Sequence, residues 1–275
     1  PVSYSGHPPC PRFGHTGVVV GSELIVFGGS KGRAYLNDLH RLDTGAWRWL
    51  KFEATGRFPS PRSSHSMTLV GTELVLFGGI GEGVPGHVHC LNDLHVLDTK
   101  TWAWSQPLTT GSLPSPRFVH RAVCIGTTMF MFGGRTEEKM KFNDLYSLDT
   151  TTMIWERRLD VEGVPPKPRG GHGCVVIGQS ILVFCGRLQG DVCVGPSTDG
   201  VHRLNTATTP MRWTCRTDIP GLAPSARGAH GCTIVQGRLM LFGGYGHIQQ
   251  GAAEGPIIEH ALGDLHVLRL LDEDV

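Results

Sequence analysis

Arginine and histidine recur at a fixed spacing along the chain. Five segments place an arginine three residues before a histidine: PRFGH (11–15), PRSSH (61–65), PRFVH (116–120), PRGGH (168–172) and ARGAH (226–230). Imidazoles could ligate a metal ion, and guanidinium groups could bind an anion. Zinc needs ligand nitrogens within about 2.0–2.1 Å of one centre, so histidines that are spaced by whole structural units would form too wide a ring. We therefore predict turn and hydrogen-bonding roles for His15, His65, His120, His172 and His230.

An aspartate follows each arginine further along the chain, and the two series are equal in number. A buried arginine or aspartate is tolerable only when it is paired, so we expect structural ion pairs or caps of loop amides. In most units a histidine stands two residues after the aspartate, and we expect a partly exposed strand position for it. The aspartates are Asp38, Asp93, Asp144, Asp199 and Asp264, and the histidines are His40, His95, His202 and His266.

These side chains lie in a repeat of about 50 residues. After each histidine comes an apolar run that ends in glycine, such as LIVFGG (24–29), and then a run opened by aspartate, such as NDLHRLDT (37–44). Four units continue to a tryptophan. Short runs bounded by Gly, Pro, Asn and Asp predict β-strands, and no helical apolar period competes. Each unit therefore predicts four strands, and it must stack on its neighbours around an axis to bury both faces.

The repeat resembles the kelch family over essentially the whole chain, and the resemblance implies an all-β fold, the β-propeller. We expect one domain over 1–275 with five four-stranded blades. We expect the last blade to be closed by an N-terminal strand, in which Val2–Tyr4 pairs beside the strand at 264–270. The alternative is a six-bladed propeller of which one blade lies outside this chain. The Cys185–Gly186 turn departs from Gly-Gly, so we expect it to be the least regular. The expected blades cover about 12–58, 62–113, 117–165, 169–223, and 227–275 plus 1–6.

Composition narrows the range of partners. The 25 basic and 24 acidic residues almost cancel, so no global field favours nucleic acid or an acidic membrane. No stretch approaches the roughly 18 apolar residues of a membrane span. The eight cysteines lack CxxC spacing, and we expect reduced thiols in a cytoplasmic or nuclear protein. We also expect a monomeric domain.

The connections between the second and third strands escape the repeat. They cover 30–36, 80–91, 135–142, 187–198 and 245–262, and we expect them to form one face that binds a partner protein or peptide. Arg135 and Arg187 directly follow the glycine turn. The planar guanidinium group of an arginine there could bind a carboxylate through two parallel hydrogen bonds. The predicted partner-binding residues are Lys31, Arg33, Arg135, Lys139, Lys141, Arg187, Tyr245 and His247.

Residues 100–135 are similar to the kelch domains of cullin-2 ubiquitin-ligase receptors, which capture peptide C-termini. That resemblance implies that Arg135 binds a terminal carboxylate, with Lys139 or Lys141 as the second basic residue. The same strands also resemble F-box kelch proteins. We therefore expect a non-catalytic interaction scaffold, with a role as substrate receptor of a ubiquitin ligase as one form of it.

Enzyme motifs are missing from the sequence. It contains no Gly-x-Ser-x-Gly elbow, phosphate loop or dinucleotide fingerprint. Kelch-like copper oxidases need a Tyr–Cys partner, and kelch-like specifier proteins need a regular Glu, Asp and His series that the cluster around Glu259 and His260 breaks. We expect no catalytic residue, cofactor or metal. A metal-dependent kelch enzyme or specifier protein is the alternative.

Overall fold

The computed structural model describes residues 3–50, 52–84, 87–218, 223–249 and 257–269. The chain divides into two compact units, each of which is described by itself. The first comprises Pro1–Phe118, Gly126–Met129 and Ser147–Glu156, and the second comprises Val119–Ile125, Phe130–Tyr146 and Arg157–Val275. Apart from the short helices η1 (Gln189–Asp191) and α1 (Pro196–Asp199), the described elements are β-strands.

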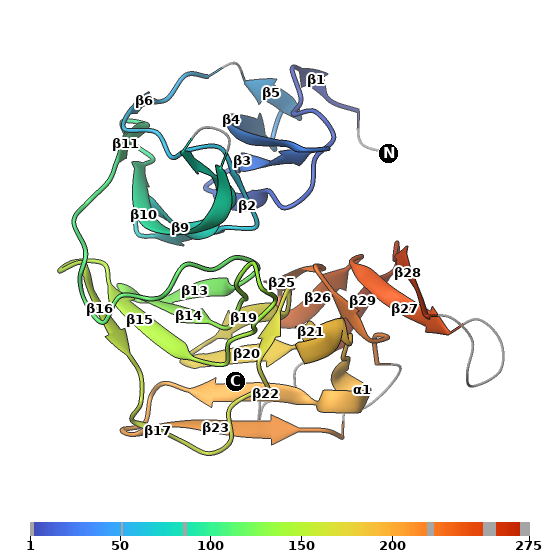
Figure 1. Ribbon diagram of the computed structural model, residues 1–275. Coiled ribbons are helices and arrows are strands. Elements are labelled where there is room, and N and C mark those ends of the chain that lie inside the picture. The colour runs from blue at the N-terminus through green and yellow to red at the C-terminus, as the bar shows by residue number, and fades with distance from the viewer. Residues whose placement is uncertain (1–2, 51, 85–86, 219–222, 250–256, 270–275) are drawn as a thin grey trace. The chain divides into compact units, whose positions relative to one another are not determined.

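The first two repeats lie in the first unit (Figure 1). The first sheet has the strand order β1-β5-β4-β3-β2, and the second has the order β6-β11-β10-β9-β7, with β8 also paired to β9. The strands of the first sheet are β1 (Ser5–Gly6), β2 (Thr16–Val20), β3 (Glu23–Lys31), β4 (Ala34–Asp43) and β5 (Arg48–Leu50). Those of the second are β6 (Thr55–Gly56), β7 (Arg62–Ser63), β8 (Ser66–Val70), β9 (Glu73–Val84), β10 (His87–Asp98) and β11 (Ala103–Ser105).

The third repeat contributes residues to both units, and its strand order is β12-β16-β15-β14-β13. The fourth sheet has the order β17-β23-β22-β20-β19, with β18 and β21 as a separate pair. The third repeat comprises β12 (Thr110–Gly111), β13 (Arg121–Ile125), β14 (Thr128–Phe132), β15 (Leu145–Asp149) and β16 (Ile154–Arg157). The fourth comprises β17 (Val161–Glu162), β18 (Arg169–Gly170), β19 (Gly173–Ile177), β20 (Ser180–Phe184), β21 (Arg187–Leu188), β22 (Val201–Asn205) and β23 (Met211–Arg216).

The fifth repeat forms two three-stranded sheets, with the orders β25-β26-β29 and β24-β27-β28. Their strands are β24 (Arg227–Gly228), β25 (Gly231–Val235), β26 (Arg238–Phe242), β27 (Tyr245–Gln249), β28 (Ile257–Ala261) and β29 (Leu265–Arg269). In all five repeats the first strand starts directly after the recurring histidine, as the sequence predicted.

The sheets of the first four repeats hold more than the four strands that we expected, with five strands in the first, third and fourth and six in the second. A short segment before each of the first four repeats pairs in parallel with the tryptophan strand of that repeat: β1 with β5, β6 with β11, β12 with β16 and β17 with β23. Glycine is required there, because a Cβ on Gly56 would lie 2.2 Å from the carbonyl oxygen of Trp104, and Gly56 has a φ of +83°.

The described start of the chain therefore belongs to the first sheet, where Ser5 and Gly6 pair with Arg48 and Trp49. The expected strand Val2–Tyr4 begins outside the described residues. Closure of the last blade by an N-terminal strand and the number of blades both stay predictions.

The glycine turns show why the second strand stops where it does. Gly28 and Gly29 have φ values of +61° and +98°, and a Cβ on Gly29 would lie 2.9 Å from the carbonyl oxygen of Phe13. The prediction that the Cys185–Gly186 turn is the least regular was wrong, because Cys185 adopts a φ of +57° and Gly186 one of +99°. Cys185 thus keeps the geometry of the repeat in a conformation that favours glycine.

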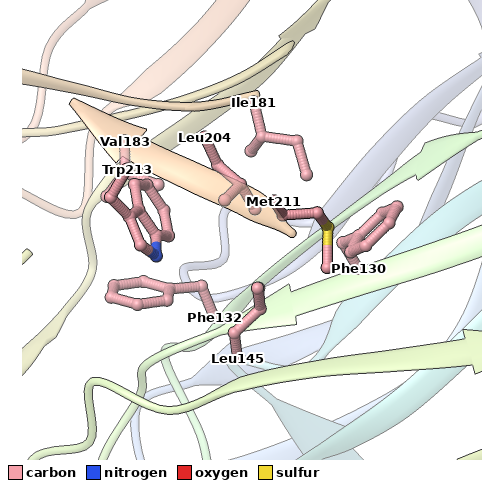
Figure 2. Close-up of a cluster of buried hydrophobic side chains, with 8 residues drawn as sticks. All are labelled: Phe130, Phe132, Leu145, Ile181, Val183, Leu204, Met211 and Trp213. Atoms are coloured by element: carbon pink, nitrogen blue, oxygen red, sulfur yellow. The ribbon is translucent and has the colours of Figure 1, made fainter. Parts of the chain in front are cut away.

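Aromatic rings join neighbouring repeats. The phenylalanine that ends the second strand of one repeat packs against the histidine and the tryptophan of the next. Phe27 lies 5.5 Å from His65 and 5.1 Å from Trp104, measured between ring centroids. Figure 2 shows Phe132 beside Trp213 within a buried cluster from the third and fourth repeats. The centroids of these two rings are 5.5 Å apart. These contacts explain why the histidine and tryptophan recur.

Candidate interaction surface at the connections between strands two and three

The recurring arginines and aspartates form structural ion pairs, as the sequence predicted. Arg62 is fully buried, and it donates hydrogen bonds of 2.7 and 2.8 Å to the two carboxylate oxygens of Asp93. It also donates to the carbonyl oxygens of Ser60 and Gly78, which fixes the glycine turn. Arg12 with Asp38, Arg169 with Asp199 and Arg227 with Asp264 repeat this pairing. None of these four arginines is therefore available to a ligand.

The histidines after the aspartates extend these pairs. His95 donates to Asp93 across 3.0 Å and is buried, which differs from the partly exposed position that we expected. Burial raises the pKa of Asp93, but the hydrogen bonds from Arg62 and His95 outweigh it and hold that pKa well below its usual value. The aspartate is therefore a permanent anion that compensates a buried cation.

In the other histidine series, His65, His120, His172 and His230 are buried, whereas His15 is exposed. Burial, together with the charges of Arg121 and Arg227, lowers the pKa of His230 to about 3. Burial and nearby arginines also place the pKa of His172 well below its ordinary value. The described residues hold no group of three or more His, Cys, Asp or Glu side chains that could ligate a metal ion. These positions thus behave as packing residues.

One constellation in the fourth repeat has the composition of a nucleophilic triad. The sulfur of Cys215 lies 3.9 Å from Nε2 of His202, and the same Nε2 lies 3.2 Å from Asp199. In a working triad the base uses one ring nitrogen for the nucleophile and the other for the carboxylate. Burial and the charge of Asp199 also raise the pKa of the Cys215 thiol. The arrangement therefore does not activate the thiol.

The connections between the second and third strands are more ordered than loops. In the first, second and fifth repeats they form β-ribbons, which are built from β3 with β4, β9 with β10 and β27 with β28. The ribbons of the second and fifth repeats also pair with the segment that carries the repeat arginine, through β7 and β24. Regular backbone pairing therefore supports much of the predicted binding face.

Arg135, Arg187 and Tyr245 occupy one equivalent position in three successive repeats of the second unit. Each directly follows the glycine turn, after Gly134, Gly186 and Gly244. The chain then returns in the same way, because the amides of Phe142, Val194 and Leu262 donate to the carbonyl oxygens of those three glycines at 2.9, 3.0 and 2.8 Å. The repeat thus presents two guanidinium groups and one phenol from the same backbone position.

Arg187 extends toward the fifth repeat. A Cβ on Gly228 would lie 2.9 Å from Cγ of Arg187, so the absence of a side chain at Gly228 makes room for the arginine. Gly228 pairs in register with Tyr245, which is 46% exposed. Arg187 and Tyr245 therefore approach the same glycine from neighbouring repeats.

Lys141 has a structural contact that the sequence analysis missed. Its side chain is 2% exposed, and its ammonium group donates to the carbonyl oxygen of Leu188 and to Asp191 at 2.6 Å. The hydrogen bond from Lys141, with the charges of Arg135 and Lys139, holds the pKa of Asp191 below its usual value. Lys139 is 69% exposed and lies 3.9 Å from Asp191. Lys139 is thus the more accessible of the two lysines.

The remaining predicted residues lie on ribbons. Lys31 and Arg33 are exposed at the tip of the β3–β4 ribbon in the first unit. His247 stands on β27, in register with Glu259 of β28. In the described residues, no helix is both long and apolar enough to cross a membrane.

Comparisons with known proteins agree with this architecture. A family model described as "FBX42, beta-propeller domain" matches residues 12–199. Acyl-CoA-binding domain-containing protein 5 of Arabidopsis thaliana is 35% identical over 247 residues, which are 87% of this chain and 37% of that protein. Rab9 effector protein with kelch motifs of Rattus norvegicus is 36% identical over 196 residues, which are 68% of this chain and 51% of that protein. The chain thus spans about half the length of these curated relatives, or less.

A solved structure, titled "Structure of YjhT", aligns with a TM-score of 0.74 at 19% identity and covers 94% of this chain and 82% of that chain. At this identity the likeness supports the fold alone. The family model, by contrast, covers more than half of the sequence and begins and ends at members of the Arg–Asp pairs, Arg12 and Asp199. The chain therefore belongs to the kelch-repeat β-propeller family.

Proposed function

We propose that this protein is a non-catalytic scaffold that binds a partner protein or peptide with an acidic or carboxylate-bearing end. Binding occurs at the connections between the second and third strands, through Arg135 and through Arg187, which has Tyr245 beside it. Within the second unit, Lys139 and His247 contribute further polar contacts. In the first unit, taken by itself, Lys31 and Arg33 are the proposed contact residues.

The observation that carries the proposal is the run of Arg135, Arg187 and Tyr245 at one repeat position. In the first two repeats this position holds Ser30 and Ile80, so the structural core does not demand a cation there. A planar guanidinium group can take a carboxylate bidentately, and a phenol can add a further hydrogen bond. Lys139, which is accessible, replaces Lys141 as the second basic residue of the third repeat, because Asp191 and Leu188 already bind Lys141.

One of the relatives supports a protein partner. The name of one of them describes an effector of Rab9 that carries kelch motifs. A role as substrate receptor of a ubiquitin ligase rests on the likeness of residues 100–135 to kelch receptors, and it is tested by ubiquitylation of a captured partner. The eight cysteines are free thiols in the structure, which agrees with a cytoplasmic or nuclear location. We also propose a monomeric domain without nucleic-acid or membrane partners.

Affinity capture from cell lysate tests the proposed site. A charge-assisted bidentate contact contributes about 1.5–3 kcal/mol, so Arg135→Glu and Arg187→Glu should each weaken partner capture at least about tenfold. The melting temperature should hardly change, and Arg187→Lys should rescue binding only in part. Arg157→Glu is the matched control, because Arg157 is exposed on β16, away from the connections. This substitution changes the charge by the same amount as the two test substitutions. Equal yields from the double variant and the wild type would exclude this site.

The alternative is a metal-dependent kelch enzyme. Metal analysis of the purified protein separates the two functions, since stoichiometric iron or copper would favour the enzyme.

A further inference from the structure

The first strand of the third repeat opens with an arginine that departs from the repeat. In the first repeat the equivalent residue is Thr16, whose hydroxyl oxygen lies 2.8 Å from Nε2 of His65 in the second repeat. A side chain at this position can therefore form a hydrogen bond to the recurring histidine of the next repeat. The residues that directly follow the five histidines are Thr16, Ser66, Arg121, Gly173 and Gly231.

The last two recurring histidines lack this hydrogen bond. Nε2 of His172 and Nε2 of His230 are buried without a hydrogen-bond partner in the described part of the chain. A residue with a hydroxyl group cannot replace Gly173, because a Cβ there would clash with the ring of Phe184 and lie 2.7 Å from Nε2 of His230. An unpaired buried nitrogen costs stability, so the second unit gives up a structural contact at the position where it gains Arg121.

Arg121 binds the backbone of the next two repeats instead. Its Nε donates to the carbonyl oxygen of His172 at 2.9 Å, and its Nη2 donates to the carbonyl oxygen of His230 at 3.1 Å. Both contacts lie within the second unit, where β13 packs beside β19 and β19 packs beside β25. Two hydrogen bonds from one planar group fix its orientation. The third nitrogen, Nη1, has no hydrogen-bond partner among the described residues, so it is an oriented donor.

The charge of Arg121 has no carboxylate beside it among the described residues. Arg169 and Arg227 each bind an aspartate, whereas Arg121 forms no ion pair in that part of the chain. The strands β13, β19 and β25 contain no acidic residue. Burial, followed by the charges of nearby arginines that include Arg121, lowers the pKa of His172 and His230, so both rings are neutral. A half-buried cation without a counter-charge favours an anionic ligand.

Strand register places this guanidinium group at the end of the sheets from which the connections emerge. Gly173 pairs with Phe184 and Gly231 pairs with Phe242, and each phenylalanine is the last residue before its glycine turn. The carbonyl groups that Arg121 binds belong to the residues just before these two glycines. Gly231 is exposed, and the nearest atom to a Cβ there would be 3.9 Å away, so the surface beside His230 has room for a ligand.

We propose that Arg121 binds a carboxylate group at this end of β13, β19 and β25. Nη1 and Nη2 each keep an N–H group for one of the two carboxylate oxygens. A singly charged carboxylate fits better than a phosphate dianion, because Arg121 is the one Lys or Arg residue on these three strands and the nearby histidines are neutral. The carboxylate belongs to a free small molecule or to a bound protein. This site does not depend on the role proposed for Arg135 and Arg187.

Acetate is the probe for the site, and nuclear magnetic resonance of arginine Nε–H groups is the measurement. Arg121→Lys assigns the cross-peak of Arg121 in the wild-type protein. Acetate should shift that cross-peak along a curve that saturates at millimolar concentration, whereas chloride at the same ionic strength should not. Arg157, which is exposed on β16 in the same unit, is the internal control and should show no saturating shift. This titration uses the wild-type chain, so its result does not depend on whether a variant folds.

Affinity capture from cell lysate distinguishes the two sources of the carboxylate. If a bound protein supplies it, Arg121→Gln should lower the yield of partner at least about tenfold, and the matched change Arg157→Gln should not. An unchanged yield together with a saturating acetate shift assigns the site to a free small carboxylate. The proposal is overturned if acetate and chloride shift the Arg121 cross-peak equally, or if Arg157 responds to acetate as Arg121 does. Failure of the Arg135 and Arg187 variants in capture leaves the acetate result unaffected, so the two proposals fail separately.

Discussion

Replacing aspartate by asparagine in the recurring Arg–Asp pairs should destabilise the protein in proportion to the burial of each carboxylate. The change is nearly isosteric, and it removes the negative charge that compensates a buried guanidinium group. The exposed fractions of the aspartate side chains are 5% for Asp199, 28% for Asp93, 42% for Asp38 and 44% for Asp264. Their arginines are nearly equal, with exposed fractions between 0 and 3%.

The structure sets different magnitudes for the four variants. Breaking a buried ion pair by removing one partner costs about 3–5 kcal/mol, because the remaining charge is left uncompensated. Asp199→Asn should reach that range. At Asp38 and Asp264 water can replace the lost carboxylate, so those variants should cost only about 1 kcal/mol, as for more exposed pairs. Asp93→Asn should fall between them.

Urea unfolding of the four variants at neutral pH measures these differences. Far-ultraviolet circular dichroism and tryptophan fluorescence should be followed together, because coincident transitions justify a single free energy of unfolding. Equal losses for Asp199→Asn and Asp38→Asn would refute the argument from burial. A loss below about 1 kcal/mol for Asp199→Asn would show that the pair is not the compensating contact that we infer.

Three further changes test other parts of the structure. Trp104→Ala should lower the free energy of unfolding by about 3–5 kcal/mol, because this indole is packed between repeats and only 2% exposed. Trp47→Ala should lower it by less than about 1 kcal/mol, because that side chain is 42% exposed. Urea unfolding measures both changes. The pKa of His230 is lower in the folded protein than in the unfolded chain, so the unfolded chain binds a proton more readily. The neutral His230 ring therefore contributes its full stabilisation above about pH 6.5, and this contribution declines as the pH falls toward about 3. His230→Gln should therefore flatten the decline of the unfolding free energy over that range, and an unchanged slope would contradict the burial of a neutral ring. Gly228→Ala should displace Arg187, because the new Cβ would lie 2.9 Å from its Cγ; affinity capture should fall while the melting temperature stays nearly constant, and undiminished capture would count against Arg187.

The parts of the fold that the sequence predicted are those in which every repeat solves the same physical problem. A buried guanidinium group needs a carboxylate, so the equal series of Arg62 and Asp93 and their counterparts predicted ion pairs before any coordinates. A second strand that ends against the next repeat needs left-handed backbone, so Gly28 and Gly29 predicted the turn. The tryptophans predicted the packing between repeats, since no other residue in the unit is as large.

The contacts that the sequence did not predict join residues that do not repeat. Lys141 and Asp191 lie on connections of different length and composition, and nothing in either segment indicates that they meet at 2.6 Å. The extra parallel strands were missed because Ser5–Gly6 and Thr55–Gly56 are too short to show a strand pattern. Cys185 was misjudged because surrounding contacts, rather than local preference, hold its backbone in the left-handed region.

The same physics explains why one position can vary without loss of the fold. The arginine of each described pair donates to the carbonyl oxygen of the first residue of its turn: Arg12 to Gly28, Arg62 to Gly78, Arg169 to Cys185 and Arg227 to Gly243. These bonds measure 3.0–3.1 Å, so the backbone is fixed up to the residue before the variable position. A side chain placed there therefore stands on a fixed backbone, whether it is buried, as Ser30 is, or partly exposed, as Arg135 and Arg187 are. A serine, an isoleucine, two arginines and a tyrosine therefore occupy this position in the five repeats, while the ion pairs keep the same turn before it.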